Sequence, residues 1–226
     1  MAETPQAPQI DPALRYSRQK DLVPADRLAA CRVAIVGVGA IGRQIALQLA
    51  AMGAPSLTLV DFDTVDASNL ASQGYLQDDL GRPKVQATGD MCRLINHSLE
   101  IIEVNDRFKR NMQIGNVLFC AVDSIATRQL IWDGVKDRVS VFIDTRMSAE
   151  VVRVLAAVDA TGRQRYPSTL FAAQEAYAGS CTAKSTIYTA NIAAGLAIGQ
   201  FTKWLRGLPV DPDLGLNILT AEMTVA

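Results

Sequence analysis

The fold of this chain is decided by the stretch Arg32-Val-Ala-Ile-Val-Gly37-Val-Gly39-Ala-Ile-Gly42. Its first half is a short, β-branched apolar run that stops at a glycine, which is typical of a buried parallel strand. Residues 41–52 then follow a helical pattern, and Gly53 stands where a helix is expected to end. A strand, a glycine-rich turn and a helix in this order are typical of a loop that binds the phosphates of a nucleotide.

Strands and helices alternate on the C-terminal side of this loop. We expect strands over 57–60, 100–104, 117–121 and 139–143, and helices over 84–95 and 125–135. This alternation predicts a parallel sheet wound by right-handed crossovers. Beyond residue 150 we expect a strand over 150–159, an irregular stretch over 163–183, a helix over 189–204 and a final strand over 216–225. The predicted fold class is α/β: a Rossmann-like, doubly wound, mostly parallel sheet with a smaller, partly antiparallel C-terminal portion.

Three segments lie outside this alternation. Residues 1–12 contain three prolines among small and polar residues and are predicted to be a flexible tail. Residues 14–29 follow a helical pattern that Pro24 divides. Residues 62–83 form a long, polar stretch that reads as loop, and a loop of this length inside a domain is more often functional than idle.

The composition limits the function classes. Hydrophobic residues make up 49% of the chain, which is enough to fill a core, and 22 basic residues nearly balance 23 acidic ones. This balance gives no basis for a nucleic-acid or membrane-surface partner. The N-terminus lacks a signal-peptide pattern, and residues 192–201 are too short an apolar stretch to cross a bilayer. The four cysteines are too widely spaced for a zinc site, so we expect reduced thiols in a cytoplasmic protein: Cys31, Cys92, Cys120 and Cys181.

The glycine loop has a physical reason for each of its glycines. Gly37 permits the tight turn, Gly39 lets the backbone approach a phosphate, and Gly42 lets the helix pack closely on the strand. Asp61 ends the second strand, where a carboxylate accepts hydrogen bonds from ribose hydroxyls. The alternative is that the glycines serve packing alone. The motif predicts nucleotide binding but leaves NAD and ATP both open.

Several other motifs occur in a fixed order along the chain, and together with the glycine loop they resemble the ThiF/MoeB/HesA family of ubiquitin-activating-enzyme-like adenylyltransferases. They are Arg15-Tyr-Ser-Arg18-Gln19, Asp61-Phe-Asp63-Thr-Val-Asp-Ala-Ser68-Asn69-Leu70, Gly81-Arg-Pro-Lys84 and Ala121-Val-Asp123. The resemblance is strong over residues 14–145 and weak beyond them. It implies one domain over 13–226, with a nucleotide-binding half over 13–145 and an acceptor-binding half over 146–226.

The resemblance implies ATP and Mg²⁺ as cofactors and a nucleotide site made of the three glycines with Asp61, Asp63, Asn69 and Lys84. Asn69 is expected to hydrogen-bond the phosphates, and Lys84, which begins a helix, to offset their charge. The alternative for Lys84 is a solvated surface charge.

Two further catalytic residues are implied. Asp123 ends a parallel strand, where an oxygen ligand for Mg²⁺ is expected, although it could instead cap the next helix. Arg18 is implied to reach the γ-phosphate from the other subunit of a homodimer, and the alternative is a surface arginine.

The implied reaction is adenylation of the C-terminal carboxylate of a small ubiquitin-like or sulfur-carrier protein. A second hypothesis is a catalytically weak scaffold that keeps the fold and binds a partner. A third is a nicotinamide oxidoreductase, which rests only on the glycine loop and Asp61. A nicotinamide enzyme has no need for Lys84 or Asp123 at these positions.

The chain departs from the family in three ways. Ser72 stands where a phosphate-binding arginine is usual, and Arg43 or Arg146 could compensate for it. Many members carry two Cys-x-x-Cys pairs for zinc, which this chain lacks, so no structural zinc is expected. The segment joining the two halves, which holds the reactive cysteine of thioester-forming relatives, is short.

Cys181 is the one cysteine near that segment, where it is either a nucleophile favoured by Lys184 or a buried structural thiol. His97, the single histidine, is interpreted as a polar residue at a helix end rather than a general base.

Overall fold

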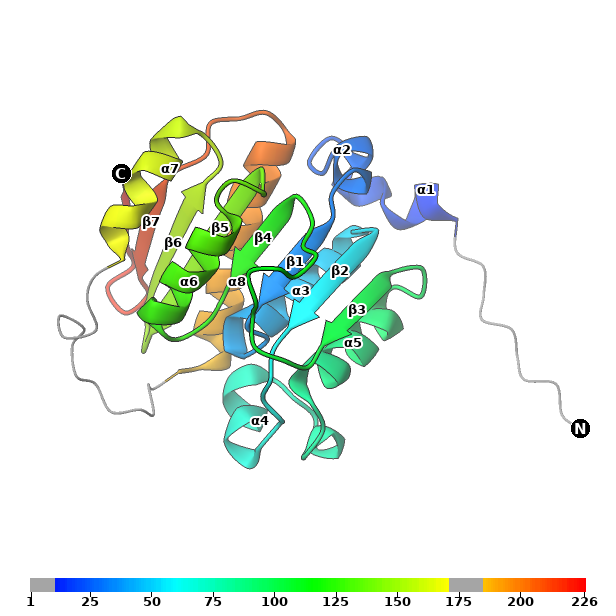
Figure 1. The fold of residues 1–226 in the computed structure, drawn as a ribbon. Helices are drawn as coiled ribbons and strands as arrows, with labels where there is room; N and C mark the ends of the chain where they lie inside the picture. Colours follow the sequence, from blue (N-terminus) through cyan, green and yellow to red (C-terminus); the bar gives the residue numbers. More distant parts are fainter. Residues whose placement is uncertain (1–10, 171–184) are drawn as a thin grey trace, which may run out of the picture.

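The computed structural model describes residues 11–170 and 185–226. In this part of the chain the strands form one eight-stranded sheet in the order β3-β2-β1-β4-β5-β6-β7-β8 (Figure 1). The strands from β3 to β5 in this order are parallel, and β6, β7 and β8 are antiparallel. Their bounds are β1 (Val33–Val36), β2 (Ser56–Val60), β3 (Glu100–Val104), β4 (Val117–Cys120), β5 (Val141–Ser148), β6 (Val151–Ala157), β7 (Asp213–Asn217) and β8 (Glu222–Val225). The predicted fold class is confirmed.

Helices cover both faces of the sheet (Figure 1). On one face lie α3 (Ala40–Met52), α5 (Lys84–Ile95) and α8 (Ile187–Leu205), and they bury the larger apolar core against the strands. On the other face lie α6 (Ile125–Val135) and α7 (Ala160–Arg165), which close a smaller core. None of the helices within the described ranges is long and apolar enough to span a membrane.

The strand order explains where a site can form. β1 lies between β2 and β4 in the sheet. The chain leaves β1 through α3 toward β2 on one side, and leaves β4 through α6 toward β5 on the other side. The chain therefore leaves the carboxyl ends of β1 and β4 in different directions. A crevice at this reversal is where ligands bind in doubly wound sheets.

The segment 62–83 differs from the predicted loop, because it contains α4 (Ala67–Gln73) and a 3₁₀ turn (Gln77–Asp79). A capping box starts α4: the Asp66 carboxylate accepts from the Ser68 N–H at 2.7 Å, and the Asn69 Oδ1 accepts from the Asp66 N–H at 3.1 Å. Gly74 ends the helix with a φ of 74°. Local caps, rather than an apolar stripe, make this helix.

Two other expectations were wrong in detail. The final strand predicted over 216–225 is a hairpin of β7 and β8, because the Asn217 side chain accepts from the Leu219 N–H at 3.1 Å and turns the chain. The start of the stretch predicted as irregular is helical: α7 is followed by a 3₁₀ turn (Tyr166–Thr169). Asp159 caps α7 by accepting from the Gly162 N–H at 2.8 Å.

The N-terminal helical segment is also shorter than predicted and consists of α1 (Pro12–Arg15), a 3₁₀ turn (Ser17–Gln19) and α2 (Ala25–Ala29). Asp21 interrupts it with a φ of 69°. Of the predicted flexible tail, residues 1–10 lie outside the described residues.

Candidate functional site

The glycine loop between β1 and α3 is shaped by close backbone contacts. Gly37 has a φ of 87°, and a Cβ at this position would lie 2.7 Å from the carbonyl oxygen of Ala121, which follows β4. A Cβ on Gly42 would lie 1.8 Å from the carbonyl oxygen of Gly37. Gly39 differs, because its Cβ would meet only the Gln73 Oε1, at 3.7 Å. The loop therefore packs tightly at its two ends and leaves open space beside Gly39.

Gln73 adds a polar atom to this open space. Its Oε1 is buried and has no hydrogen-bond partner in the described part of the chain. A buried acceptor without a partner costs free energy unless a ligand or water satisfies it. Beside Gly39 and the free N–H groups at the start of α3, this atom fits a site that a polar ligand completes.

Asp61 is fixed against the glycine loop. Its Oδ2 accepts from the Val38 N–H at 2.6 Å, and its Oδ1 accepts from the Asp63 N–H at 2.9 Å. Burial raises the pKa of Asp61, and these two hydrogen bonds together with nearby Lys84 partly offset that rise. Each carboxylate oxygen keeps a second lone pair that can accept from a ribose hydroxyl.

Tyr75, which the sequence analysis missed, holds the glycine loop through a hydrogen bond to its backbone. Its hydroxyl donates to the Val38 carbonyl at 2.6 Å and lies 3.1 Å from the Thr88 Oγ1. Burial raises the pKa of the Tyr75 phenol, so it stays protonated as a donor. The signal that could have found it was an aromatic residue near the middle of the mostly polar stretch 62–83.

Lys84 and Asp63 form an ion pair at the start of α5. The Lys84 Nζ lies 3.2 Å from the Asp63 Oδ2, and the Lys84 N–H donates to the Asp63 carbonyl at 3.0 Å. Lys84 is only 6% exposed, whereas the Asp63 side chain is 48% exposed. The solvated surface charge considered for Lys84 is therefore wrong: its ammonium is enclosed beside the strand end that carries Asp61.

Asn69 and Ser72 lie on α4. Asn69 is 7% exposed, and its side chain is held in place: Oδ1 closes the capping box and Nδ2 donates to the Ser68 Oγ at 3.3 Å. One N–H of the amide remains for another acceptor. The Ser72 hydroxyl donates to the Ser68 carbonyl at 3.0 Å, an ordinary contact within a helix that supplies no positive charge.

Asp123 is exposed in the loop between β4 and α6. The N-cap of α6 is Ser124, whose Oγ accepts from the Thr127 N–H at 3.4 Å. The capping role considered for Asp123 is therefore wrong, and its carboxylate faces solvent at the carboxyl edge of the sheet.

The residues fit Mg²⁺ only as part of a metal–nucleotide complex. Among the described residues no three His, Cys, Asp or Glu side chains converge to hold a metal ion. Mg²⁺ commonly binds through one or two carboxylates, substrate phosphates and water, and Asp123 can supply one such carboxylate.

The two arginines considered as substitutes at Ser72 are both engaged elsewhere. Arg43 is 1% exposed, donates to the Gly74 carbonyl at 3.1 Å and lies 4.3 Å from the centroid of the Tyr75 ring. Arg146 pairs with Asp144 at 2.8 Å and donates to the Thr169 carbonyl at 2.9 Å. Neither the surface role nor the phosphate contact considered for Arg43 is correct, because burial and these contacts fix it inside the fold.

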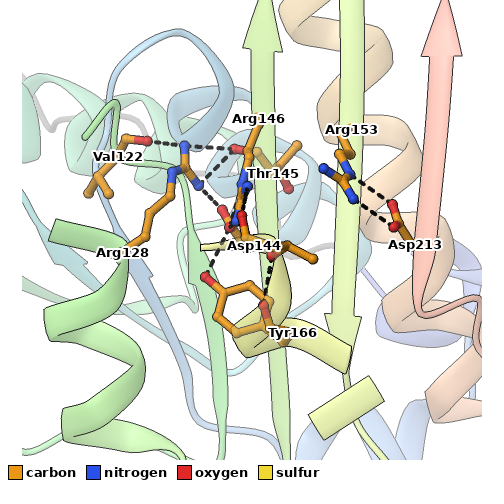
Figure 2. A network of polar contacts seen from close by, with 9 residues as sticks. Val122, Arg128, Asp144, Thr145, Arg146, Arg153, Tyr166 and Asp213 are labelled. Atoms are coloured by element: carbon orange, nitrogen blue, oxygen red, sulfur yellow. Dashed lines mark hydrogen bonds and ion pairs between the residues drawn. The ribbon is translucent and has the colours of Figure 1, made fainter. Parts of the chain in front are cut away.

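A buried polar network lies behind the loop that carries Asp123 (Figure 2). Arg128 of α6 forms an ion pair with Asp144 of β5, and Asp144 also accepts from the Tyr166 hydroxyl at 3.0 Å. Burial lowers the pKa of Arg128, which nevertheless stays charged because a guanidinium hardly deprotonates in proteins. The sequence analysis missed this network, although Arg128 shares a helical face with the apolar residues Ile131 and Val135.

Arg18 is exposed and lies far from the other predicted site residues of its own chain. The neighbouring Gln19 donates to the Met52 carbonyl at 2.7 Å, at the end of α3 that points away from the glycine loop. Figure 1 accordingly shows α1 and α2 at the edge of the sheet opposite α4. The 13 residues of α3 separate the two edges by about 20 Å, so Arg18 does not contact this site within one chain.

Of the cysteines, Cys31, Cys92 and Cys120 are free and buried, as expected for inert thiols. Cys181 lies outside the described residues. His97 is exposed just after the end of α5.

The sequence of this chain was compared with those of known proteins, and relatives were found. The model of the ThiF family matches residues 15–222. A molybdopterin-synthase adenylyltransferase from Salmonella typhimurium is 40% identical over 100 residues, which cover 42% of this chain and 40% of that protein. The SAMP-activating enzyme E1 of Haloferax volcanii is 31% identical over 135 residues, which cover 56% of this chain and 50% of that protein. The chain thus spans half or less of the length of these relatives.

Among solved structures, PaaA superposes with a TM-score of 0.77 at 22% identity, and the match covers 99% of this chain and 85% of that one. At this identity the likeness shows the fold. It extends over both the parallel and the antiparallel parts of the sheet.

Proposed function

The chain belongs to the ThiF family, and from that premise we propose that it is an ATP-dependent adenylyltransferase. Its substrate is the C-terminal carboxylate of a small ubiquitin-like or sulfur-carrier protein. Relatives named molybdopterin-synthase adenylyltransferase and SAMP-activating enzyme support this choice. The observation that carries the proposal is the enclosed Lys84 ammonium, paired with Asp63 beside Asp61, because a dinucleotide enzyme has no use for it there.

In the proposed reaction a carboxylate oxygen of the acceptor attacks the α-phosphorus of ATP. A new oxygen–phosphorus bond forms while the bond to the bridging oxygen breaks, and pyrophosphate leaves with the bonding electrons. The product is an acyl adenylate. Such a transfer depends mainly on positioning and on stabilisation of developing charge.

The residues of this chain would divide that work. The N–H groups at the start of α3 and the Asn69 amide would hold the phosphates, and Asp61 would accept hydrogen bonds from the ribose. Lys84 would offset the charge on the phosphates by exchanging its contact with Asp63 for a phosphate oxygen. Asp123 would hold Mg²⁺, which when bound neutralises charge on the leaving pyrophosphate.

The proposed enzyme is a cytoplasmic homodimer in which Arg18 completes the site of the other subunit. The position of Arg18 supports this role, because in its own chain Arg18 lies at the opposite edge of the sheet from the site.

Calorimetry and isotope exchange test the proposal. Mg·ATP should bind the purified protein, Asp123→Ala should weaken that binding, and NADH should give no signal. Exchange of pyrophosphate into ATP should then depend on a small acceptor protein with a free C-terminal carboxylate. Binding of NADH instead of Mg·ATP, or exchange at background with every such acceptor, would contradict the proposal.

A catalytically weak scaffold is the second candidate. It is favoured by one observation: Ser72 lacks the usual positive charge, and Arg43 and Arg146 are both engaged within the fold. This candidate predicts a stable, partner-binding protein that neither binds Mg·ATP nor exchanges pyrophosphate.

A further inference from the structure

A buried guanidinium lies directly behind the Asp123 loop, which we define as residues 121–124. Arg128 is 4% exposed and donates to the Val122 carbonyl, the residue before Asp123. It also lies within 3.4 Å of the Thr145 carbonyl and forms an ion pair with Asp144 (Figure 2). One side chain therefore joins the Asp123 loop to strand β5.

The contact occurs where the backbone ladder stops. The parallel pairing of β4 with β5 ends at Cys120 opposite Asp144. Val122 and Thr145 lie just beyond that last pair, so no further rung of the ladder holds their carbonyl groups on this side. The planar fork of Arg128 reaches both carbonyls at once, which a lysine cannot do with the same geometry.

Asp144, the acidic partner of Arg128, is also held by two other side chains. Asp144 is fully buried, and its Oδ2 accepts from the Arg146 Nε at 2.9 Å and from the Tyr166 hydroxyl at 3.0 Å. Arg128 is thus paired with a buried carboxylate that two other side chains also hold. The rigidity passes on to the Val122 carbonyl and so to the backbone of Asp123.

Stability alone does not explain this arrangement. Removing a guanidinium and a carboxylate from water carries a large cost, and a buried ion pair often contributes no more than apolar residues of similar volume would. Arg128 moreover interrupts the apolar face of α6 that Ile131 and Val135 continue. Such a pair is best understood as fixing one local geometry.

We infer that Arg128 is a positioning residue for Asp123: it holds the Asp123 loop at the place from which the carboxylate binds the metal of Mg·ATP. This inference rests on the proposed function. It adds to that function a residue that touches neither the nucleotide nor the metal.

The experiment measures ATP binding by calorimetry with Mg²⁺ and again in EDTA, and reports the ratio of the two affinities. In Arg128→Lys this Mg²⁺ enhancement should fall about tenfold or more, while the affinity in EDTA stays within about twofold of the wild type. Asp123→Ala should abolish the enhancement. The double variant should be no worse than Asp123→Ala, because Arg128 acts through Asp123.

The matched control is Arg163→Lys. Arg163 also donates to backbone carbonyls, those of Val139 at 2.7 Å and Ser140 at 3.2 Å, but at the opposite end of β5. It should lower the melting temperature and leave the Mg²⁺ enhancement unchanged. If Arg128→Lys does not fold, Arg128→Gln combined with Asp144→Asn removes both buried charges together and should show the same lost enhancement.

Two results would overturn the inference. One is an equal loss of ATP affinity with and without Mg²⁺ in Arg128→Lys, which is what general loosening of the fold would cause. The other is an unchanged enhancement in Arg128→Lys while Asp123→Ala abolishes it. Failure of the proposed function looks different, because the wild-type protein would then show no ATP binding, and this inference would fall with it.

Discussion

The Lys84 ammonium lies 3.2 Å from the Asp63 carboxylate and is almost fully enclosed, whereas half of the Asp63 side chain faces solvent. The backbone N–H of Lys84 also donates to the Asp63 carbonyl, so the first residue of α5 is joined to the segment after β2. An enclosed cation with an exposed partner can exchange that partner for a phosphate oxygen. The pair therefore keeps a positive charge in place for the nucleotide phosphates of the proposed reaction.

Replacing Lys84 by Met should remove this charge and keep most of the packing of its stem. We expect the maximal rate of pyrophosphate exchange to fall by about 10²–10³, the usual effect of losing one group that stabilises developing charge. Lys136→Met, at an exposed position after α6, is the control and should exchange at the wild-type rate. A Lys84→Met protein that exchanges normally would show that the ammonium serves only its pair with Asp63.

The proposed homodimer predicts complementation between two inactive variants. Arg18→Ala and Asp123→Ala should each be inactive alone, because each removes one part of every site. After mixing and subunit exchange, half of the dimers are heterodimers with one intact site of two, so about one quarter of the wild-type exchange rate should return. If exchange activity does not recover in samples that mass spectrometry shows to contain heterodimers, Arg18 does not act in the site of the other subunit.

Much of the fold was predictable because its strands are simple. Every residue of β1 and β4 is apolar and buried, so both were found from short apolar runs that end at a glycine or near an aspartate. α4 was missed because its stability comes from the Asp66 capping box and Gly74 rather than from a periodic apolar face. The β7–β8 hairpin was missed because the turn depends on one side-chain contact of Asn217.

The site was predictable to a different extent. The positions of Asp61, Lys84 and Asp123 were predicted correctly, because each follows a strand or begins a helix, whereas their roles came from the family resemblance and stay predictions. Arg128 and Tyr75 were not found, because their partners are backbone carbonyls that sequence patterns do not reveal. The same limit hid Arg43, whose contacts with Gly74 and Tyr75 exist only in the folded chain.

The stability of the antiparallel half should depend on pH through Asp213. The Asp213 carboxylate accepts from Arg153 at 2.8 and 2.9 Å (Figure 2) and from Arg165 at 2.8 Å. These arginines, Arg153 foremost, lower the pKa of Asp213. A lowered pKa in the folded state means that the stabilisation is fully present above the ordinary value of about 3.9 and is lost as pH falls through the lowered value. Asp213→Asn should therefore lower the free energy of unfolding by roughly 1–3 kcal/mol at pH 7.

Urea denaturation of both proteins at pH 7 and near pH 2.5 checks this prediction, and the difference between them should shrink toward zero at the lower pH. Asp211→Asn is the control, because the Asp211 side chain is 25% exposed, against 9% for Asp213, and pairs with a single lysine, Lys203. This substitution should cost less than about 1 kcal/mol at pH 7. A difference for Asp213→Asn that is independent of pH would instead indicate a packing effect.

Ser72 offers the sharpest choice between an enzyme and a scaffold. Its hydroxyl donates only to the Ser68 carbonyl of its own helix, so Ser72→Arg should leave α4 intact and place a guanidinium on the helix beside Asn69. If the phosphates bind here, this charge-assisted contact should strengthen Mg·ATP binding by about 1.5–3 kcal/mol, or roughly 10- to 100-fold in the dissociation constant. Ser72→Gln has similar reach without the charge and should bind Mg·ATP like the wild type. Calorimetry with Mg·ATP on the wild type and the two variants distinguishes the two functions. Tighter binding only in the arginine variant would place the phosphates beside α4. Equal, negligible binding in all three proteins would mean that the fold is kept for a partner and not for a nucleotide.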